Sequence, residues 1–172
     1  PDMNAAKTRQ DLFSMLNQLN ITTSTLDHPA VFTVSESHEI EAALPGGHTK
    51  NLFLKDAKDR LFLVVALASA PVELKRLPAL IGSARLSFGK GELMQEVLGV
   101  TPGSVTVFSL INDPQKRVNV VLDAALMAHG IINAHPLENT ATTSIARADL
   151  LRFIEACGHV PKIVTFDGLE GS

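Results

Sequence analysis

The alternation of apolar and polar residues predicts many short helices and strands. Leucines at helical spacing predict a helix over residues 8–19, with Thr8 and Asp11 placed as a capping box. Residues 60–67 are apolar on both faces, which is typical of a central strand, and they form a predicted hairpin with residues 51–56. Further strands are expected near 22–27, 104–110, 117–122, 131–135 and 163–166, and further helices over 35–43, 71–82, 92–98 and 148–156.

The order of these elements predicts an α+β fold. Strands and helices are interspersed irregularly, without the repeating strand–helix–strand unit of a parallel α/β protein, so we expect a mixed, mostly antiparallel sheet flanked by helices. The chain has 172 residues, which fits one domain of the usual ~100–200 residues. No linker, low-complexity tract or internal repeat divides the sequence, and we therefore predict a single domain over residues 1–172.

The composition is that of an ordinary globular protein, with 45% hydrophobic and 19% charged residues. The longest apolar run, residues 61–68, has the length of a strand and is too short to span a bilayer. The chain does not begin with the basic and then apolar pattern of a secretory signal. The single cysteine, Cys157, cannot form an internal disulfide and fits a reducing compartment. We expect a cytoplasmic, monomeric protein that does not enter a membrane.

Charge is distributed unevenly along the chain. The net charge is −3, yet residues 50–90 hold eight basic against three acidic side chains, a net of +5. One interpretation is a patch that contacts phosphate groups, with Arg85 and Lys75 among its members. The alternative is that this cluster in the sequence never becomes a surface.

Several common chemistries find no support. Gly89-Lys90 lies where a phosphate-binding P-loop would need Gly at position 84 and Ser or Thr at position 91, but the chain has Ala84 and Gly91. The six histidines contain no His-x-x-x-His pair, and there is no Gly-x-Ser-x-Gly nucleophile motif. Eight Phe without Trp or Tyr give no aromatic stacking signature of an RNA-binding module. We expect neither a metal site nor a cofactor.

The segment from Gly46 to Asp56 carries the first candidate for chemistry. A Gly-Gly turn leads into an apolar strand, with Lys50 expected at the first strand position. Side chains alternate faces along a strand, so Lys50 shares a face with Leu52 and Leu54. A buried and unpaired ammonium is costly. The lysine therefore either extends into water or reaches over a pocket.

Two further segments carry polar groups at positions where strands end or begin. His135 stands at a predicted strand exit, where its ring nitrogens could bind a polar ligand, or where it is simply a surface histidine. The loop from Gly99 to Ser104 places glycines on both sides of Pro102, so that its backbone N–H groups could hold a carbonyl or another oxygen-rich group. The alternative is a plain turn into the next strand.

Four blocks in order, at residues 49–56, 99–105, 133–137 and 148–154, resemble the YbaK family of aminoacyl-tRNA editing domains. That family includes the insertion domain of bacterial prolyl-tRNA synthetases. The chain is most similar to the freestanding, alanyl-specific subgroup of prolyl-tRNA editing proteins. Its Gly99-to-Gly103 loop differs from the Gly-Gly-x-Ser-Pro type of the cysteinyl-specific branch, which favours alanine as the edited residue.

The resemblance implies a curved, barrel-like sheet flanked by helices and a trans-editing deacylase that hydrolyses mischarged alanyl-tRNA for proline. The implied partners are the acceptor end of that tRNA and prolyl-tRNA synthetase, without metal or cofactor. The implied catalytic residues are Lys50, Asn51 and His135, and the implied substrate-binding residues are Gly99, Thr101, Pro102, Gly103, Ser104, Arg85 and Lys75. Two alternatives stay open: a cysteinyl- or seryl-tRNA deacylase, and a non-catalytic module that binds tRNA and regulates.

Overall fold

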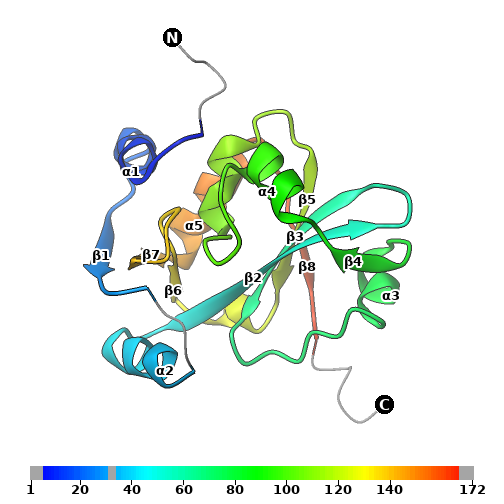
Figure 1. The fold of residues 1–172 in the computed structure, drawn as a ribbon. Coiled ribbons are helices and arrows are strands. Elements are labelled where there is room, and N and C mark those ends of the chain that lie inside the picture. Colours follow the sequence, from blue (N-terminus) through cyan, green and yellow to red (C-terminus); the bar gives the residue numbers. More distant parts are fainter. Residues whose placement is uncertain (1–5, 31–33, 167–172) are drawn as a thin grey trace.

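A mixed sheet forms the centre of the molecule (Figure 1). The structure is a computed structural model that describes residues 6–30 and 34–166. The strands pair in the order β1 (Thr23–Asp27), β7 (Ala141–Ala146), β6 (Ile131–Ala134), β2 (Gly47–Asp56), β3 (Leu61–Leu67), β5 (Val118–Asp123) and β8 (Lys162–Val164), and β4 (Leu86–Phe88) also pairs with β2.

The pairing directions confirm the predicted α+β class. β2 is antiparallel to β3 and β4 but parallel to β6, and the pairs β3–β5 and β5–β8 are also parallel. Among the described strands, β1 and β8 lie at opposite ends of the pairing order and do not pair with each other. The sheet is therefore open, and the expected barrel-like shape holds only loosely.

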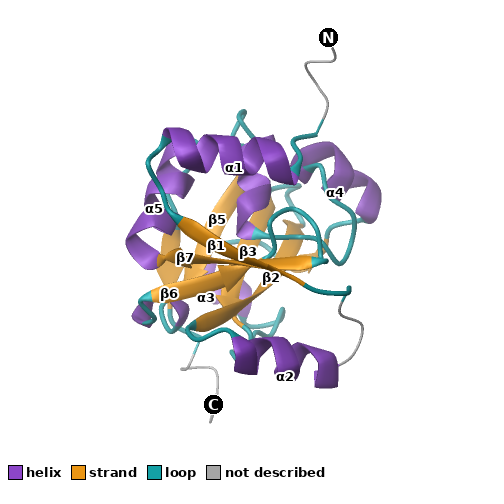
Figure 2. Ribbon diagram, turned by 90° about the vertical axis from the view of Figure 1, so that its left-hand side faces the viewer, coloured by secondary structure: helices purple, strands orange, loops and turns teal. Residues whose placement is uncertain are grey.

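Helices cover the sheet from opposite sides, as Figure 2 shows for α1 and α4 on one side and α2 on the other. The helical segments are α1 (Arg9–Gln18), α2 (Val34–Ala43), α3 (Leu77–Ile81), α4 (Gly91–Leu98), α5 (Arg147–Ala156) and the 3₁₀ helices η1 (Val107–Asn112) and η2 (Leu126–Ala128). The larger core packs α1, α4, α5 and η1 against one sheet face, and a smaller core packs α3 against the other. No helix in the described part of the chain is long and apolar enough to cross a bilayer.

β3 is the central strand that its composition predicts. Leu61, Leu63 and Val65 enter the larger core, whereas the alternating residues Phe62 and Val64 enter the smaller one. Both faces of the strand are therefore buried, which explains why its sequence is apolar without a break.

The predicted start of the first helix is also confirmed. The Thr8 backbone N–H donates to Asp11 Oδ2 at 2.8 Å, and the Asp11 backbone N–H donates to Thr8 Oγ1 at 3.4 Å. These reciprocal bonds satisfy backbone groups that would have no partner at a helix start. The sequence signal is local, so it needs no tertiary contact to be read correctly.

Two predicted elements are wrong in type or extent. Residues 104–110 were expected to be a strand, but η1 covers Val107–Asn112, and its apolar side chains are buried around most of its circumference. Thr106 caps this helix by accepting a hydrogen bond from the Phe108 N–H at 3.3 Å. The helix expected from Pro71 begins only at Leu77. An earlier start would place Pro78 in a helix interior, where proline has no N–H to donate and clashes with the preceding turn.

Strand β2 is longer than predicted, and two strands were missed. β2 begins at Gly47, so Lys50 lies inside the strand and not at its first position. The missed strands are β4 and β7. β4 has only three residues, and β7 is rich in Thr, Ser and Ala, so neither produces a strong alternation of apolar and polar residues.

Candidate active site

A gap in the sheet lies along one edge of β2. On the side away from β3, β2 pairs with β6 only at Gly47 and His48, and with β4 only from Leu54 to Asp56. The Phe53 carbonyl accepts the Gly89 N–H at 2.9 Å on this side. Backbone groups alternate in direction along a strand, so the N–H and C=O of Asn51 face the same edge, where no strand is paired.

A cleft of about 290 Å³ opens at this gap. It is lined by Thr49, Lys50, Asn51, Leu52, Phe53, Phe88, Gly89, Met94, Pro102, Gly103, Val105 and His135. The three predicted catalytic residues therefore lie around one cleft, together with part of the predicted loop. Gly89 allows β4 to approach this closely, because a Cβ at that position would lie 2.3 Å from the Phe53 ring.

The Lys50 side chain lies on the face of β2 that the sequence predicted. Leu54 belongs to the smaller core and Leu52 packs against it, so the predicted shared face is confirmed. The half-buried Lys50 side chain donates from Nζ to the Ala70 carbonyl at 2.5 Å. An ammonium has three N–H donors, so this bond leaves two for a carbonyl or phosphate oxygen at the cleft.

Asn51 points to the opposite face and holds an oxygen without a partner. Its Nδ2 lies 3.5 Å from Thr49 Oγ1, which itself donates to the Asn133 carbonyl at 2.9 Å. Asn51 Oδ1 is buried and makes no hydrogen bond within the described residues. Buried polar atoms are nearly always paired. Asn51 lines the cleft, and its side-chain carbonyl keeps an unused capacity to accept a hydrogen bond from an N–H or O–H group.

His135 follows the last residue of β6 and is held as one tautomer. Its Nδ1 lies 2.9 Å from the Ala141 carbonyl, which can only accept, so Nδ1 carries the proton and Nε2 is left as an acceptor. Burial lowers the pKa of His135 below its usual 6.5, and the charge of His28 lowers it further, although the bond to Ala141 opposes both. The imidazole is therefore neutral near pH 7 and can accept a proton at Nε2.

The loop after α4 contributes two of its predicted residues to the cleft. Pro102 and Gly103 line it. The Ser104 N–H closes a turn onto the Thr101 carbonyl at 3.0 Å, whereas the Gly103 N–H makes no hydrogen bond within the described residues. The backbone N–H of Gly103 is therefore free to donate to a ligand.

The other predicted loop residues lie outside the cleft lining. Thr101 is exposed and Ser104 is half-buried, and neither lines the cleft. Gly99 ends α4 in the left-handed region, with a φ of 66°. A Cβ there would lie 2.8 Å from both Ala6 Cβ and Asn112 Nδ2, so Gly99 serves the packing of the helix end.

The predicted tRNA contacts Arg85 and Lys75 are both exposed and also lie outside the cleft lining. Arg85 precedes β4, whereas Lys75 lies between β3 and α3. Neither side chain forms an ion pair within the described residues, so both can meet an anionic partner. Part of the basic stretch is neutralised internally, by the pairs Lys55–Asp59, Arg60–Asp56 and Arg76–Glu73.

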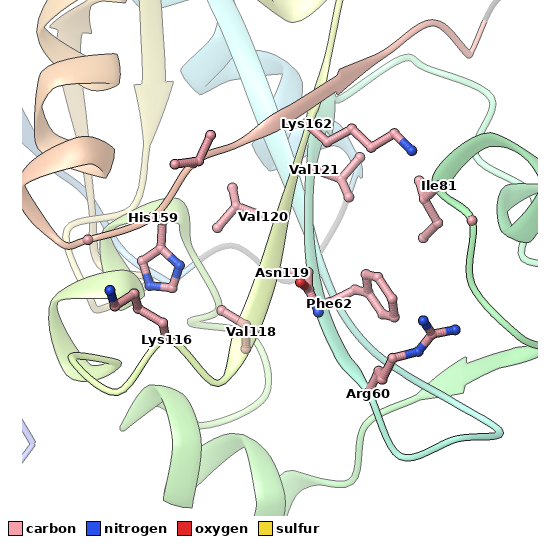
Figure 3. Close-up of a pocket in the computed structure, with 13 residues that line it drawn as sticks. Arg60, Phe62, Ile81, Lys116, Val118, Asn119, Val120, Val121, His159 and Lys162 are labelled. Carbon is pink, nitrogen blue, oxygen red and sulfur yellow. The ribbon is translucent and has the colours of Figure 1, made fainter.

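A second hollow, of about 340 Å³, lies beside the first half of β5 (Figure 3). β8 joins β5 only from Val121 onward, which leaves this edge open. Lys116 and Lys162 lie at the hollow, and buried His159 has its Nε2 3.4 Å from Asp113 Oδ2. It is larger than the cleft, but none of the predicted site residues lines it. A third hollow, of about 490 Å³, is larger still, and of the predicted site residues only Gly99 lines it. Size alone therefore does not identify the active site.

Comparison with known proteins identifies the family of this chain. The model of the aminoacyl-tRNA editing domain matches residues 28–153, an interval that includes every residue lining the cleft. The chain belongs to the aminoacyl-tRNA editing family. The expectation of an aminoacyl-tRNA deacylase is thereby confirmed.

Relatives and solved structures agree with this assignment. A zebrafish (Danio rerio) prolyl-tRNA synthetase associated domain-containing protein 1 is 42% identical over 161 residues, 92% of this chain and 88% of the relative. The prolyl-tRNA editing protein ProX of Acetoanaerobium sticklandii is 35% identical over 164 residues, 95% of this chain and 98% of the relative. The crystal structure of a candidate trans-editing enzyme for prolyl tRNA synthetase has the same fold, with a TM-score of 0.68 at 18% identity, covering 91% of this chain and 96% of that one.

Proposed function

We propose that this deacylase acts in trans on tRNA for proline that has been mischarged with alanine. The observation that carries the proposal is the set of unused polar groups in one cleft: Asn51 Oδ1, His135 Nε2 and the Gly103 N–H. Together they match the ammonium, the attacking water and the carbonyl of an aminoacyl ester. The names of the relatives support tRNA for proline as the substrate and prolyl-tRNA synthetase as the functional partner.

A small inner hollow supports alanine as the edited residue. It has a volume of about 90 Å³, lies beneath α2, and shares Thr49 and His135 with the cleft. Its remaining lining residues are Ile40, Glu41, His48, Ala68, Asn133, Ala134 and Thr142. A synthetase site shaped for proline cannot strongly reject a smaller amino acid, because each missing methylene gives only ~1–3 kcal/mol of discrimination. A second site reverses that selection when it admits a methyl group and excludes a ring, and the hollow beside the cleft is where we place this selection.

The reaction is attack by water on the ester carbonyl. In this mechanism His135 Nε2 accepts a proton as the water oxygen bonds to the carbonyl carbon, and the Gly103 N–H stabilises the negative carbonyl oxygen. The C–O bond to the ribose then breaks, and the proton passes from His135 to the departing ribose oxygen. Asn51 Oδ1 orients the substrate ammonium, and Lys50 holds an ester or phosphate oxygen at the mouth of the cleft.

The test is deacylation of alanyl-, cysteinyl-, seryl- and prolyl-tRNA for proline, measured in parallel. Release of alanine alone supports the proposal. Preferential release of cysteine or serine would assign the protein to another specificity. Binding of all four substrates without release of any amino acid would mark it as a non-catalytic, tRNA-binding regulatory module.

A further inference from the structure

Phe88 stands exposed at the mouth of the cleft. Its exposed fraction is 62%, whereas Phe53, Phe62, Phe108, Phe153 and Phe166 are buried. The course of β4 explains why Phe88 is exposed. Leu86 is 7% exposed and lies in the smaller core, whereas Phe88, the next residue on the same face, extends past that core and lines the cleft. The absence of Trp and Tyr gave no aromatic stacking signature in the sequence, and the short strand that presents this ring was not predicted.

The backbone beside the ring is held in place. Phe88 pairs with Leu54 across the β2–β4 ladder, and the next residue, Gly89, donates its N–H to the Phe53 carbonyl at 2.9 Å. Gly89 also packs so closely on the Phe53 ring that any side chain there would force a shift. The backbone that carries the ring is thus held at the cleft before any ligand arrives, which lowers the entropy cost of binding.

The surroundings of Phe88 fit a nucleic acid better than an apolar protein surface. Ser87 and Lys90 are exposed on either side of it, and no acidic residue in the described part of the chain lines the cleft. Among the described residues, the other largely exposed hydrophobic side chains are Leu26, Ile131, Val160 and Ile163, and none of them lines the cleft. An isolated aromatic face beside cationic side chains is the combination that binds a base and its phosphates.

We propose that Phe88 stacks on the nucleobase of the 3′-terminal nucleotide of the tRNA. This inference rests on the proposed function. The scissile ester is attached to the ribose of that nucleotide, so its base must lie one sugar away from the ester. With the ester carbonyl at Gly103 and His135, the ring of Phe88 lies on the same cleft and can cover the base. Phe88 then selects for an intact nucleotide end, independently of the amino acid.

The experiment compares wild type, Phe88→Ala, Phe88→Leu and Phe88→Trp by kcat/KM. One alanyl-tRNA has an intact 3′ end, and a second lacks only its terminal base. Stacking contributes ~1–3 kcal/mol per base, so Phe88→Ala should lose about 5- to 150-fold on the intact substrate. Phe88→Trp should retain the wild-type rate, and Phe88→Leu should lose most of what Phe88→Ala loses. On the abasic substrate the ratio of wild type to Phe88→Ala should fall to about one.

A matched control is Val160→Ala, which truncates a side chain that is 92% exposed and lies outside the cleft. Equal losses on the intact and abasic substrates, or full activity in Phe88→Ala, would overturn the stacking role. Full activity in Phe88→Leu would show that residue 88 makes only an apolar contact, and this result would overturn the stacking role as well.

Equilibrium binding of uncharged tRNA, with and without its terminal base, repeats the comparison without turnover. If wild type failed to deacylate alanyl-tRNA, the proposed function would fail, and this binding measurement would still decide the role of Phe88. A weaker affinity of Phe88→Ala for the intact end alone supports stacking, and an identical affinity of both proteins for both ends refutes it.

Discussion

Replacing Asn51 with leucine should make the protein more stable and much less active. The buried Oδ1 has no partner within the described residues, and the only bond of Nδ2 is the long one, 3.5 Å, to Thr49. An unsatisfied buried acceptor costs ~1–3 kcal/mol. Leucine has a similar shape and no polar atom, so Asn51→Leu should raise the free energy of unfolding by about 1–2 kcal/mol, or Tm by about 2–8 °C for a chain of this size.

The same change should lower kcat/KM for alanyl-tRNA. If Oδ1 accepts a hydrogen bond from the substrate ammonium, its loss removes ~1.5–3 kcal/mol, which corresponds to about 10- to 150-fold. Thermal or urea unfolding measures the first effect, and single-turnover deacylation measures the second. The opposite signs of the two effects distinguish a binding residue from a structural one.

Asn133→Leu is the matched control, because Asn133 is a buried asparagine that is fully bonded. Its Nδ2 donates to the Pro45 carbonyl at 3.2 Å, and its Oδ1 accepts the Ser144 hydroxyl at 2.5 Å. Breaking these bonds should destabilise the protein by ~2–4 kcal/mol. A loss of stability in Asn51→Leu comparable to that control, or activity within about twofold of wild type, would refute the assignment of Asn51 Oδ1 as an unused acceptor.

Lys50→Ala should lower kcat/KM by about 10- to 100-fold, the value of a hydrogen bond to a charged group, and should leave the fold intact by circular dichroism; full activity would remove the lysine from the site. Because the pKa of His135 is lowered by burial and by a neighbouring histidine, kcat/KM should be flat above pH 7 and should fall once the pH drops below that lowered pKa. A His135→Ala variant with the same pH profile would contradict the role of His135 as the base. Asp56, despite its burial, has a pKa of about 2, because backbone N–H groups and a guanidinium hydrogen-bond to it. Its stabilising effect should be complete above about pH 4 and lost as the pH falls towards 2. Urea unfolding across pH should therefore show that Asp56→Asn is less stable than wild type at pH 7 and loses less further stability in acid. Arg85→Ala and Lys75→Ala should each reduce the slope of log affinity for tRNA against log salt by about one unit; unchanged slopes would mean that the tRNA binds elsewhere.

The sequence by itself determined the elements whose signal is local, and through the family resemblance it named candidate catalytic residues. The Thr8 capping box and the doubly apolar β3 are such signals, because the groups that produce them lie within a few residues of one another. The ordered blocks around Lys50, Asn51 and His135 identified the editing family, since that recognition depends on residue types in order and not on geometry.

Only the tertiary structure decided where the cleft is and what faces it. The gap at β2 exists because β6 pairs with its beginning, matching Gly47 to Ile132, while β4 pairs with its end. Pairings between segments so distant along the chain leave no periodic signal in either of them. For this reason the sequence could name Lys50 and Asn51 but could not show that their side chains leave opposite faces of one strand at an unpaired edge. Nor could it show that Phe88 presents an exposed aromatic ring at the same cleft.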